Sequence, residues 1–354
     1  MKRRVWALVF LAALGALVTW ATLSPHTPAA SANGSPGADS GKPLIVDSDE
    51  HGALVLDVAS GEVIGFDAHG SVRWRDRDLA GRLYVSCLAQ CPDAVGSGSP
   101  DGGAPPPVVW RTGSSRSIGG PVTGTVLWAR SPQDAVVARD DGEHSLIDLR
   151  GARGTSTHRV IGTDPHLFTA PDASHAVLVL TQGGTASYRM LNHGPNGWEM
   201  SEPHTAPLDG ACLGRSGRPV LLYGSNDTFL KTDAGTAPHR LPAKNIGQCS
   251  ASPNALLTQE FTGSTDDGAQ TVSRLLDRSG RVRWERTDTG VHSGDLDPDT
   301  GLVALTADTG VVVLDSAGRQ AARIAGAVDA QFVRPGCLIV LTSDRHITTR
   351  CVRS

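Results

Sequence analysis

A turn sequence, Asp-x-x-Gly, recurs at the ends of strand-like segments of this chain and constrains its fold more than any other feature. It spans Asp67–Gly70, Asp148–Gly151, Asp277–Gly280 and Asp315–Gly318. The Asp can accept hydrogen bonds from turn amides, and the Gly can take the positive φ that a short hairpin needs. The intervals between markers are 81, 129 and 38 residues, which fit two, three and one copies of a unit of about 40 residues.

The segment 290–326 is the clearest copy of this unit. Its strands are LVALTA, VVVLD and QAARIA, and its turns are DPDTG, DTG and SAG. Short β-branched and apolar runs bounded by Asp, Thr, Ser and Gly are typical of antiparallel strands. With more degenerate copies included, units begin near residues 43, 81, 123, 166, 209, 247, 291 and 328, and the last runs out after three strands.

These repeats predict an all-β protein, and more specifically a β-propeller over residues 43–354. The composition agrees, since 41 Gly, 22 Pro and 19% charged residues suit a turn-rich chain. A four-stranded unit cannot bury both of its faces alone, so copies must pack on one another, and radial closure limits their exposed edges. We expect eight blades, or seven if residues 81–122 form only an insertion.

Three segments carry a resemblance to a known family. GFDAHGSVRW, LLDRSGRVRW and VLDSAGRQAA resemble the blades of quinoprotein-type, or PQQ-like, propellers. The similarity is clear over 52–76 and 270–318. The family implies either a quinone-dependent dehydrogenase or a non-enzymatic scaffold or sensor. Its dehydrogenases carry an adjacent Cys-Cys disulfide and a calcium site, whereas this chain has no Cys-Cys pair, so we expect no cofactor.

The N-terminus predicts export of the body. Residues 1–4 are basic, residues 5–23 carry no charge and are long enough to cross a bilayer, and residues 24–42 form a Pro/Ala/Ser/Gly tether. As an anchor, 5–23 gives a single-pass protein of the cell membrane with its C-terminal body outside. As a signal peptide it is cleaved, with a small-x-small site at 30–32, and the protein is secreted. Both alternatives stay open.

Six cysteines in an exported chain indicate three disulfides, with partly free thiols as the alternative, and the number of cysteines alone does not choose among the fifteen pairings. Cys337 and Cys351 flank a hairpin symmetrically, so they can face each other. Cys212 and Cys249 lie 37 residues apart, about one repeat, and so can occupy equivalent positions on neighbouring units. Cys87 and Cys91 can close a small loop. No C-x-x-C occurs, which disfavours a metal site at these cysteines.

Other candidate residues fit structural roles at least as well as functional ones. Asp295, Asp297 and Asp299 alternate in DLDPDTG, which is either a turn between blades or a calcium loop. Trp74 and Trp284 occupy equivalent repeat positions, which predicts packing between blades rather than ligand stacking. The irregular segment 91–107 is a possible contact site. The sequence contains none of the common nucleophile, zinc or nucleotide-binding motifs, so it offers no candidate catalytic residue.

The body after residue 4 has 29 basic and 36 acidic residues and no basic cluster, which argues against nucleic acid as a partner. We therefore expect a non-catalytic, extracytoplasmic binding or scaffold module that presents a propeller face to a protein or cell-envelope partner. The alternatives are a divergent quinone-dependent oxidoreductase and a small-ligand or polysaccharide sensor.

Overall fold

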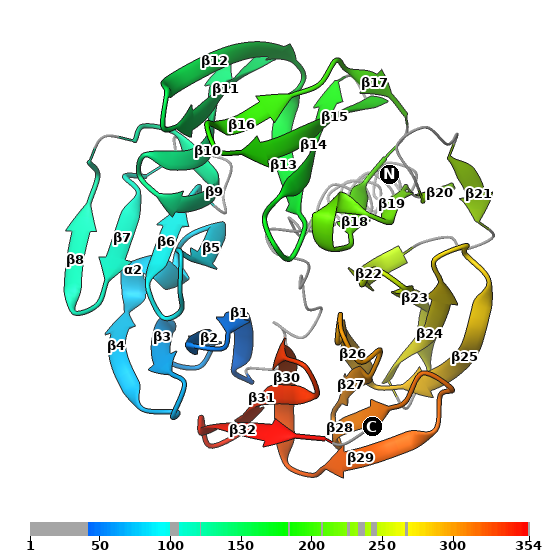
Figure 1. Ribbon diagram of the computed structural model, residues 1–354. Helices are drawn as coiled ribbons and strands as arrows, with labels where there is room; N and C mark the ends of the chain where they lie inside the picture. The colour runs from blue at the N-terminus through cyan, green and yellow to red at the C-terminus, as the bar shows by residue number, and fades with distance from the viewer. Residues whose placement is uncertain are drawn as a thin grey trace, which may run out of the picture.

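The computed structural model describes residues 42–352, apart from 100–105, 121, 183–184, 207, 225–226, 233–237, 242–245 and 266–267. The described chain forms eight antiparallel sheets, arranged in chain order around a central axis (Figure 1). The expected helix at 5–23 and all but the last residue of the tether at 24–42 lie outside the described residues. Among the described helices, none has the length and apolar character needed to cross a membrane.

The first four sheets, or blades, run from Leu44 to Thr205. Blade 1 contains β1 (Leu44–Asp49), β2 (Gly52–Asp57), β3 (Glu62–Asp67) and β4 (Val72–Asp76), and blade 2 contains β5 (Tyr84–Cys87), β6 (Ala94–Ser97), β7 (Val109–Thr112) and β8 (Ser115–Ile118). Blade 3 contains β9 (Thr125–Ser131), β10 (Asp134–Asp141), β11 (His144–Gly151) and β12 (Gly154–Ile161). Blade 4 contains β13 (Thr163–Thr169), β14 (His175–Gln182), β15 (Thr185–Gly194) and two short outer strands, β16 (Gly197–Met200) and β17 (His204–Thr205).

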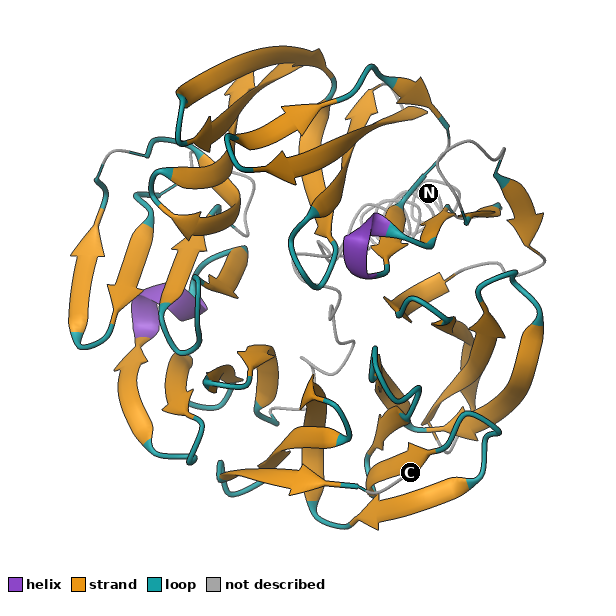
Figure 2. Cartoon of the chain, in the orientation of Figure 1, coloured by secondary structure: helices purple, strands orange, loops and turns teal. Residues whose placement is uncertain are grey.

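The other four blades complete the ring. Blade 5 contains β18 (Gly210–Leu213), β19 (Val220–Tyr223), β20 (Thr228–Lys231) and β21 (His239–Leu241), and blade 6 contains β22 (Ile246–Ala251), β23 (Ala255–Thr265), β24 (Gly268–Asp277) and β25 (Val282–Thr289). Blade 7 contains β26 (Val291–Leu296), β27 (Val303–Ala307), β28 (Gly310–Leu314) and β29 (Gln320–Ile324), and blade 8 contains β30 (Ala327–Arg334), β31 (Cys337–Thr342) and β32 (Ile347–Cys351). Two short helices, α2 (Arg77–Ala80) and η2 (Arg215–Gly217), lie in connections (Figure 2).

The eight-bladed prediction is confirmed, and the seven-bladed alternative is wrong because β5, β6, β7 and β8 form a four-stranded blade of their own. The expected starts of the units fall within a few residues of the first strand of each blade. The last blade has three described strands, as its sequence predicted. The segment 91–107 is less irregular than expected, because Ala94–Ser97 is strand β6. The contact role predicted for that segment is not tested, and its residues 100–105 lie outside the described part of the chain.

The Asp-x-x-Gly turn joins the third and fourth strands of blades 1, 6 and 7. In blade 7, Asp315 accepts hydrogen bonds from the amides two and four residues later, and Gly318 has a φ of 79°. Asp67 and Asp277 make the same pair of bonds in their own turns. Because this left-handed φ favours Gly, the two marker residues together specify the hairpin.

The fourth marker, Asp148–Gly151, is not a turn, and this part of the prediction is wrong. Asp148 lies within β11, is 5% exposed and pairs with Arg139 of β10 at 2.8 Å. Thr157 of β12 donates a hydrogen bond to the same carboxylate at 2.7 Å. Since neighbouring strands satisfy this carboxylate, it makes no turn bonds, and β11 continues to Gly151.

Apolar faces of adjacent blades pack together and form the core. Trp74 of β4 packs with Leu54 of its own blade and Val109 of blade 2, and only 6% of it is exposed. Trp284 of β25 packs between blades 6 and 7, where a Cβ on Gly318 would come within 2.9 Å of its ring. The predicted packing role of both tryptophans is confirmed. Burial of such a ring contributes a few kcal/mol at each seam.

The ring closes through side-chain bonds rather than through a strand shared between its first and last described blades. β1 belongs to blade 1, and Asp329 of β30 accepts a hydrogen bond from the amide of Ile45 at 2.8 Å. Gln331 accepts from the Ser48 hydroxyl at 2.8 Å and donates to the Ile45 carbonyl at 3.2 Å. Blades 8 and 1 are therefore joined at the axis, where strands of both meet.

Candidate functional site

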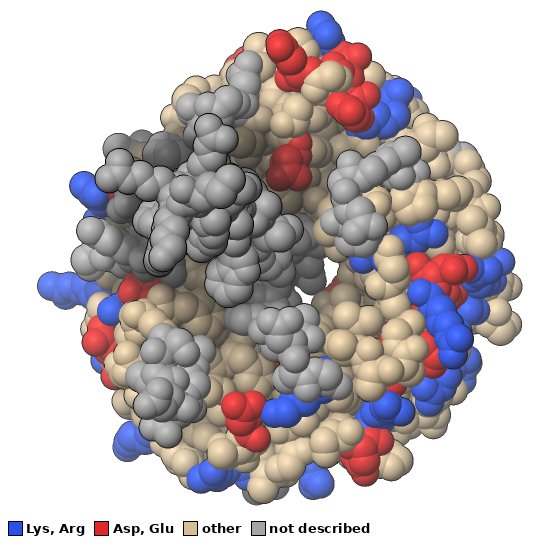
Figure 3. Space-filling model, turned by 180° about the vertical axis from the view of Figure 1, so that it is seen from behind, with Lys and Arg blue, Asp and Glu red and all other residues tan. Residues whose placement is uncertain are grey.

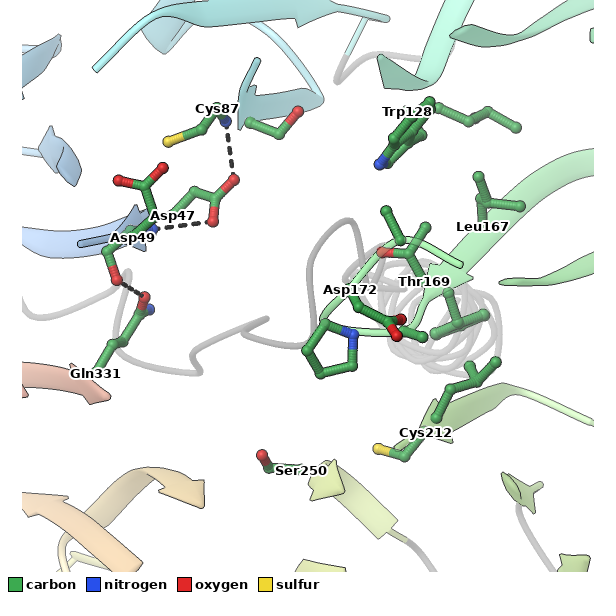
Figure 4. A pocket seen from close by; sticks show the side chains of 18 of the residues that line it. Asp47, Asp49, Cys87, Trp128, Leu167, Thr169, Asp172, Cys212, Ser250 and Gln331 are labelled. Atoms are coloured by element: carbon green, nitrogen blue, oxygen red, sulfur yellow. Dashed lines mark hydrogen bonds between the residues drawn. The ribbon is translucent and has the colours of Figure 1, made fainter. Parts of the chain in front are cut away.

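A pocket of about 510 Å³ lies on the axis and is lined by the inner strands of all eight blades (Figure 4). Most of its lining residues come from the later part of each inner strand and from the turn that follows, such as Asp47–Asp49 in blade 1 and Thr169–Ala173 in blade 4. The sequence did not reveal this pocket, because its residues are brought together only by ring closure.

One side of the pocket carries the apolar side chains of Trp128, Leu167 and Phe168, with the polar Thr169 and Asp172 beside them. The Trp128 ring is held edge-on against Trp198, with centroids 5.1 Å apart. Asp47, Asp49 and Gln331 lie on the opposite side, as Figure 4 shows, together with Ser48. A mixed lining of this kind suits recognition of a group that has both an apolar body and polar atoms.

Two Asp-x-Asp pairs join neighbouring blades at or near the pocket, and three of their four aspartates, Asp47, Asp49 and Asp295, line it. Asp47 accepts from the amide of Cys87 at 2.8 Å, and Asp49 accepts from the amide of Cys91 at 2.9 Å. Both hydrogen bonds join blade 1 to blade 2. The two carboxylates of blade 1 therefore hold two backbone amides of blade 2 that lie four residues apart in sequence.

Blade 7 repeats this arrangement. Asp295 accepts from the amide of Phe332 at 2.6 Å, and Asp297 accepts from the amide of Gly336 at 2.5 Å, both in blade 8. Sequence reasoning missed this role, although the spacing DSD at 47–49 and DLD at 295–297 was a visible signal.

The three candidate calcium residues do not converge. Asp295 lies in β26 beside the pocket, whereas Asp297 is buried and caps its own turn by accepting from the amides of Asp299 and Thr300. Asp299 is exposed and pairs with Arg215 of η2 at 3.1 Å. The turn also lies inside blade 7, between β26 and β27, and not between blades as the sequence suggested. Within the described residues, no group of three or more His, Cys, Asp or Glu is placed to hold a metal ion.

Three aspartates of the inner strands, Asp47, Asp295 and Asp329, have raised pKa values. Burial raises the pKa of Asp47 to about 6, although hydrogen bonds from the amides of Cys87 and Ser48 oppose the shift. Burial likewise raises the pKa of Asp329 to about 6, against hydrogen bonds from Ile45 and Ala330. The pKa of Asp295 is also raised, for the same main reason. Asp47 and Asp329 therefore change charge at mildly acidic pH, which couples their charge to the contacts they make between blades.

All three expected disulfides form, and two of them line the pocket. Cys87–Cys91 closes the turn after β5, and Cys212–Cys249 joins the inner strands of blades 5 and 6, with Cα atoms 6.1 Å apart. Cys337–Cys351 crosses the β31–β32 hairpin, with Cα atoms 4.0 Å apart. The two pocket disulfides restrict the backbone around the cavity.

Comparison with known proteins supports the fold. No family model matches the chain, and no curated protein matches its sequence. Similar solved structures include dihydro-heme d1 dehydrogenase NirN in complex with DHE, with a TM-score of 0.52 and 14% identity over 80% of this chain and 73% of that chain. A eukaryotic initiation factor gives a TM-score of 0.48 and 10% identity over 80% of this chain and 87% of that one. Apo AztD from Citrobacter koseri gives a TM-score of 0.45 and 12% identity over 88% of this chain and 95% of that chain. At these identities the likeness concerns the propeller fold alone.

Proposed function

We propose that this protein is a non-catalytic, extracytoplasmic binding module of the PQQ-like type, tethered to the cell membrane by residues 5–23. Its axial pocket takes an exposed group of a cell-envelope partner. The observation that carries the proposal is the pocket itself, because all eight blades contribute to its lining. Its volume of about 510 Å³ is in the range of small-ligand sites, so the bound group has the size of a small molecule.

The pocket is built to be rigid, which favours binding. Asp47 and Asp49 accept hydrogen bonds from two amides of blade 2 and so fix it against blade 1, and the Cys212–Cys249 disulfide fixes blade 5 against blade 6. A site that is ordered before its ligand arrives loses less conformational entropy on binding. The rigid frame therefore supports recognition of a group with a defined shape.

Export is supported by the cysteines and by the sequence before the propeller. The six cysteines form three disulfides in the structure, and disulfides persist mainly in oxidising compartments. The uncharged segment 5–23 follows three basic residues, which favours an outward-facing body. The PQQ-like repeats at 65–74 and 275–284 favour a family with known non-enzymatic members.

Charge on the perimeter favours a protein or envelope partner over nucleic acid. On the face shown in Figure 3, basic and acidic side chains lie interspersed around the rim. On the outer strands, for example, Arg159 of β12 pairs with Asp141 at 2.7 Å, and Arg286 pairs with Asp288 of β25 at 2.6 Å. Paired charges of this kind present little net positive field to a phosphate backbone.

The test blocks the pocket in the full-length protein. Ala89 is exposed at the pocket, so Ala89→Trp places a large ring in its opening. Ala321 is exposed on the outer strand β29, and Ala321→Trp adds the same ring at the perimeter. Each protein is cross-linked in cell-envelope extract and its adducts are compared. We expect an adduct with the wild type and with Ala321→Trp that Ala89→Trp loses. Equal recovery by all three, or recovery by none, would contradict the proposal.

A further inference from the structure

Beyond Ile347, whose carbonyl lies against Gly70 of blade 1, no described strand covers the outer edge of β32. In each of the other seven blades, the third strand pairs with an outer strand. In blade 8, β32 is the third strand, and no described strand lies beyond it. Figure 1 shows β32 at the perimeter of the ring, with β30 and β31 on its inner side. Among the described strands, none occupies the fourth position of blade 8.

The hydrogen-bond pattern shows which groups this edge presents. Val352 donates its amide proton to the Gly336 carbonyl at 2.7 Å, and the Thr342 amide donates to the His346 carbonyl at 3.0 Å. In an antiparallel pair, residues that bond to the partner strand alternate with residues that do not. The even-numbered residues of β32 therefore bond to β31, and Thr349 and Cys351 direct their N–H and C=O groups outward.

The edge is regular and stiff. β32 pairs with β31 without a register shift, from Cys337 opposite Cys351 to Leu341 opposite Ile347. The Cys337–Cys351 disulfide joins a pair that exchanges no backbone hydrogen bonds, where the side chains of the two strands come closest. Proteins usually protect an edge strand with proline, a bulge or several charges. β32 is ITTRC and has only one charge, so its edge is open to pairing.

Positively charged side chains near this edge favour an acidic partner segment. Arg350 is exposed on β32, and Arg334 is exposed at the end of β30. Arg345 of the hairpin turn is already paired with Asp57 of blade 1 at 3.0 Å. A second copy is disfavoured, since antiparallel pairing of two β32 strands centred on Thr349 would place two Arg350 side chains on the same face as diagonal neighbours.

We propose that β32 is a docking edge for an extended, acidic segment of a partner protein, which adds antiparallel to it as the fourth strand of blade 8. Main-chain hydrogen bonds to Thr349 and Cys351 hold the segment, and carboxylates of the segment contact Arg350. This edge lies on the perimeter, away from the axial pocket, so its test and that of the pocket are independent.

A peptide that alternates Thr and Glu over eight residues serves as the probe, and its binding to the full-length protein is followed by fluorescence anisotropy. The controls are the same peptide with Lys in place of Glu and a version with every second amide N-methylated. We expect the acidic peptide to bind on the order of tenfold more tightly than the Lys peptide, and N-methylation to abolish binding. Equal binding of all three peptides, or of none, would overturn the proposal.

Two substitutions at one position separate docking from folding. Thr349→Pro removes only an outward-facing N–H group and leaves the bonds to β31 in place, whereas Thr349→Val keeps that group. We expect Thr349→Pro to lose peptide binding and Thr349→Val to retain it, and Arg350→Glu to reverse the preference between the acidic and basic peptides. Wild-type affinity for the acidic peptide in Thr349→Pro would contradict strand addition.

Hydrogen exchange of single amides gives a readout inside the same strand. In the free protein, the amides of Thr348 and Arg350 should be protected by β31, and those of Thr349 and Cys351 should exchange rapidly. Addition of the acidic peptide should protect the second pair. If Thr349 and Cys351 are protected before any peptide is added, another segment of the chain or a second copy already covers the edge, and the proposal fails.

Discussion

Two aspartates of the inner strands, Asp47 and Asp329, combine two roles, because their carboxylates join blades and have pKa values of about 6. Asp47 and Asp329 each accept amide hydrogen bonds from a neighbouring blade, and burial raises the pKa of each to about 6. In the unfolded chain these groups return to the ordinary value of 3.8. The folded state therefore holds the proton more tightly than the unfolded state does, and ionisation of these groups destabilises the fold.

This linkage predicts a stability maximum at mildly acidic pH. Asp47 and Asp329, whose pKa values are raised, contribute to the free energy of unfolding. Their contribution is fully present below pH 3.8 and is lost as pH rises through about 6. For Asp329, which is 4% exposed, this contribution to the free energy of unfolding is about 3 kcal/mol at most. In the opposite direction, the turn carboxylates of Asp67 and Asp315 have pKa values lowered mainly by backbone hydrogen bonds, so their contribution is lost as pH falls below 3.8.

Thermal unfolding measured between pH 3 and pH 8 checks this prediction. We expect the melting temperature of the wild type to rise as pH falls from 8 to 5 and to drop again below pH 4. Asp47→Asn removes one carboxyl group with a raised pKa. As pH falls from 8 to 5, the melting temperature of this variant should therefore rise less than that of the wild type. An unchanged slope in that variant would show that Asp47 does not carry the effect.

Among the elements, the strands and most of their turns were predictable from sequence, because each depends on neighbouring residues. Asp67 and Gly70 specify their hairpin through contacts within a span of five residues, so the two residues can be recognised in the sequence alone. Asp148 has the same spacing but a different role, since Arg139 and Thr157 from adjacent strands satisfy it. Those partners become apparent only when the register of the sheet is known.

The disulfide between neighbouring blades should stabilise more than the local one. Cys212–Cys249 links residues 37 apart, whereas Cys87–Cys91 links residues four apart. Replacing Cys212 and Cys249 by Ala should lower the free energy of unfolding by about 2–4 kcal/mol, because a longer loop is released in the unfolded chain. The matched double Ala variant at 87 and 91 should lose less, as measured by urea-induced unfolding. A larger loss in the local pair would contradict this ranking.

The segment 5–23 makes a prediction about topology. A cysteine introduced at Ser35 should react with a membrane-impermeant maleimide in intact cells, because the predicted orientation of segment 5–23 places Ser35 outside. A cysteine introduced at Lys2 should react only after lysis, if the segment is retained as an anchor. Reaction of the Ser35 variant only after lysis would contradict export of the body.

For the molecule as a whole, the repeat period predicted eight blades, but neither the closure of the ring nor the pocket. Closure depends on Asp329 and Gln331 bonding to Ile45 and Ser48, which lie more than 280 residues away. The pocket depends on residues from all eight inner strands, and no two neighbouring residues indicate it. The Asp-x-Asp spacing was the one local signal, and without the register between blades it resembled a turn.

Photo-crosslinking in living cells tests the central claim, that the axial pocket is the binding site, most directly. A photoreactive amino acid is placed at Ser250, which is half-buried and lines the pocket, and in a second protein at the exposed Ala321 on β29. We expect a specific adduct from the Ser250 position and none of the same mass from Ala321. The same adduct from both positions, or no adduct from Ser250, would contradict recognition in the pocket.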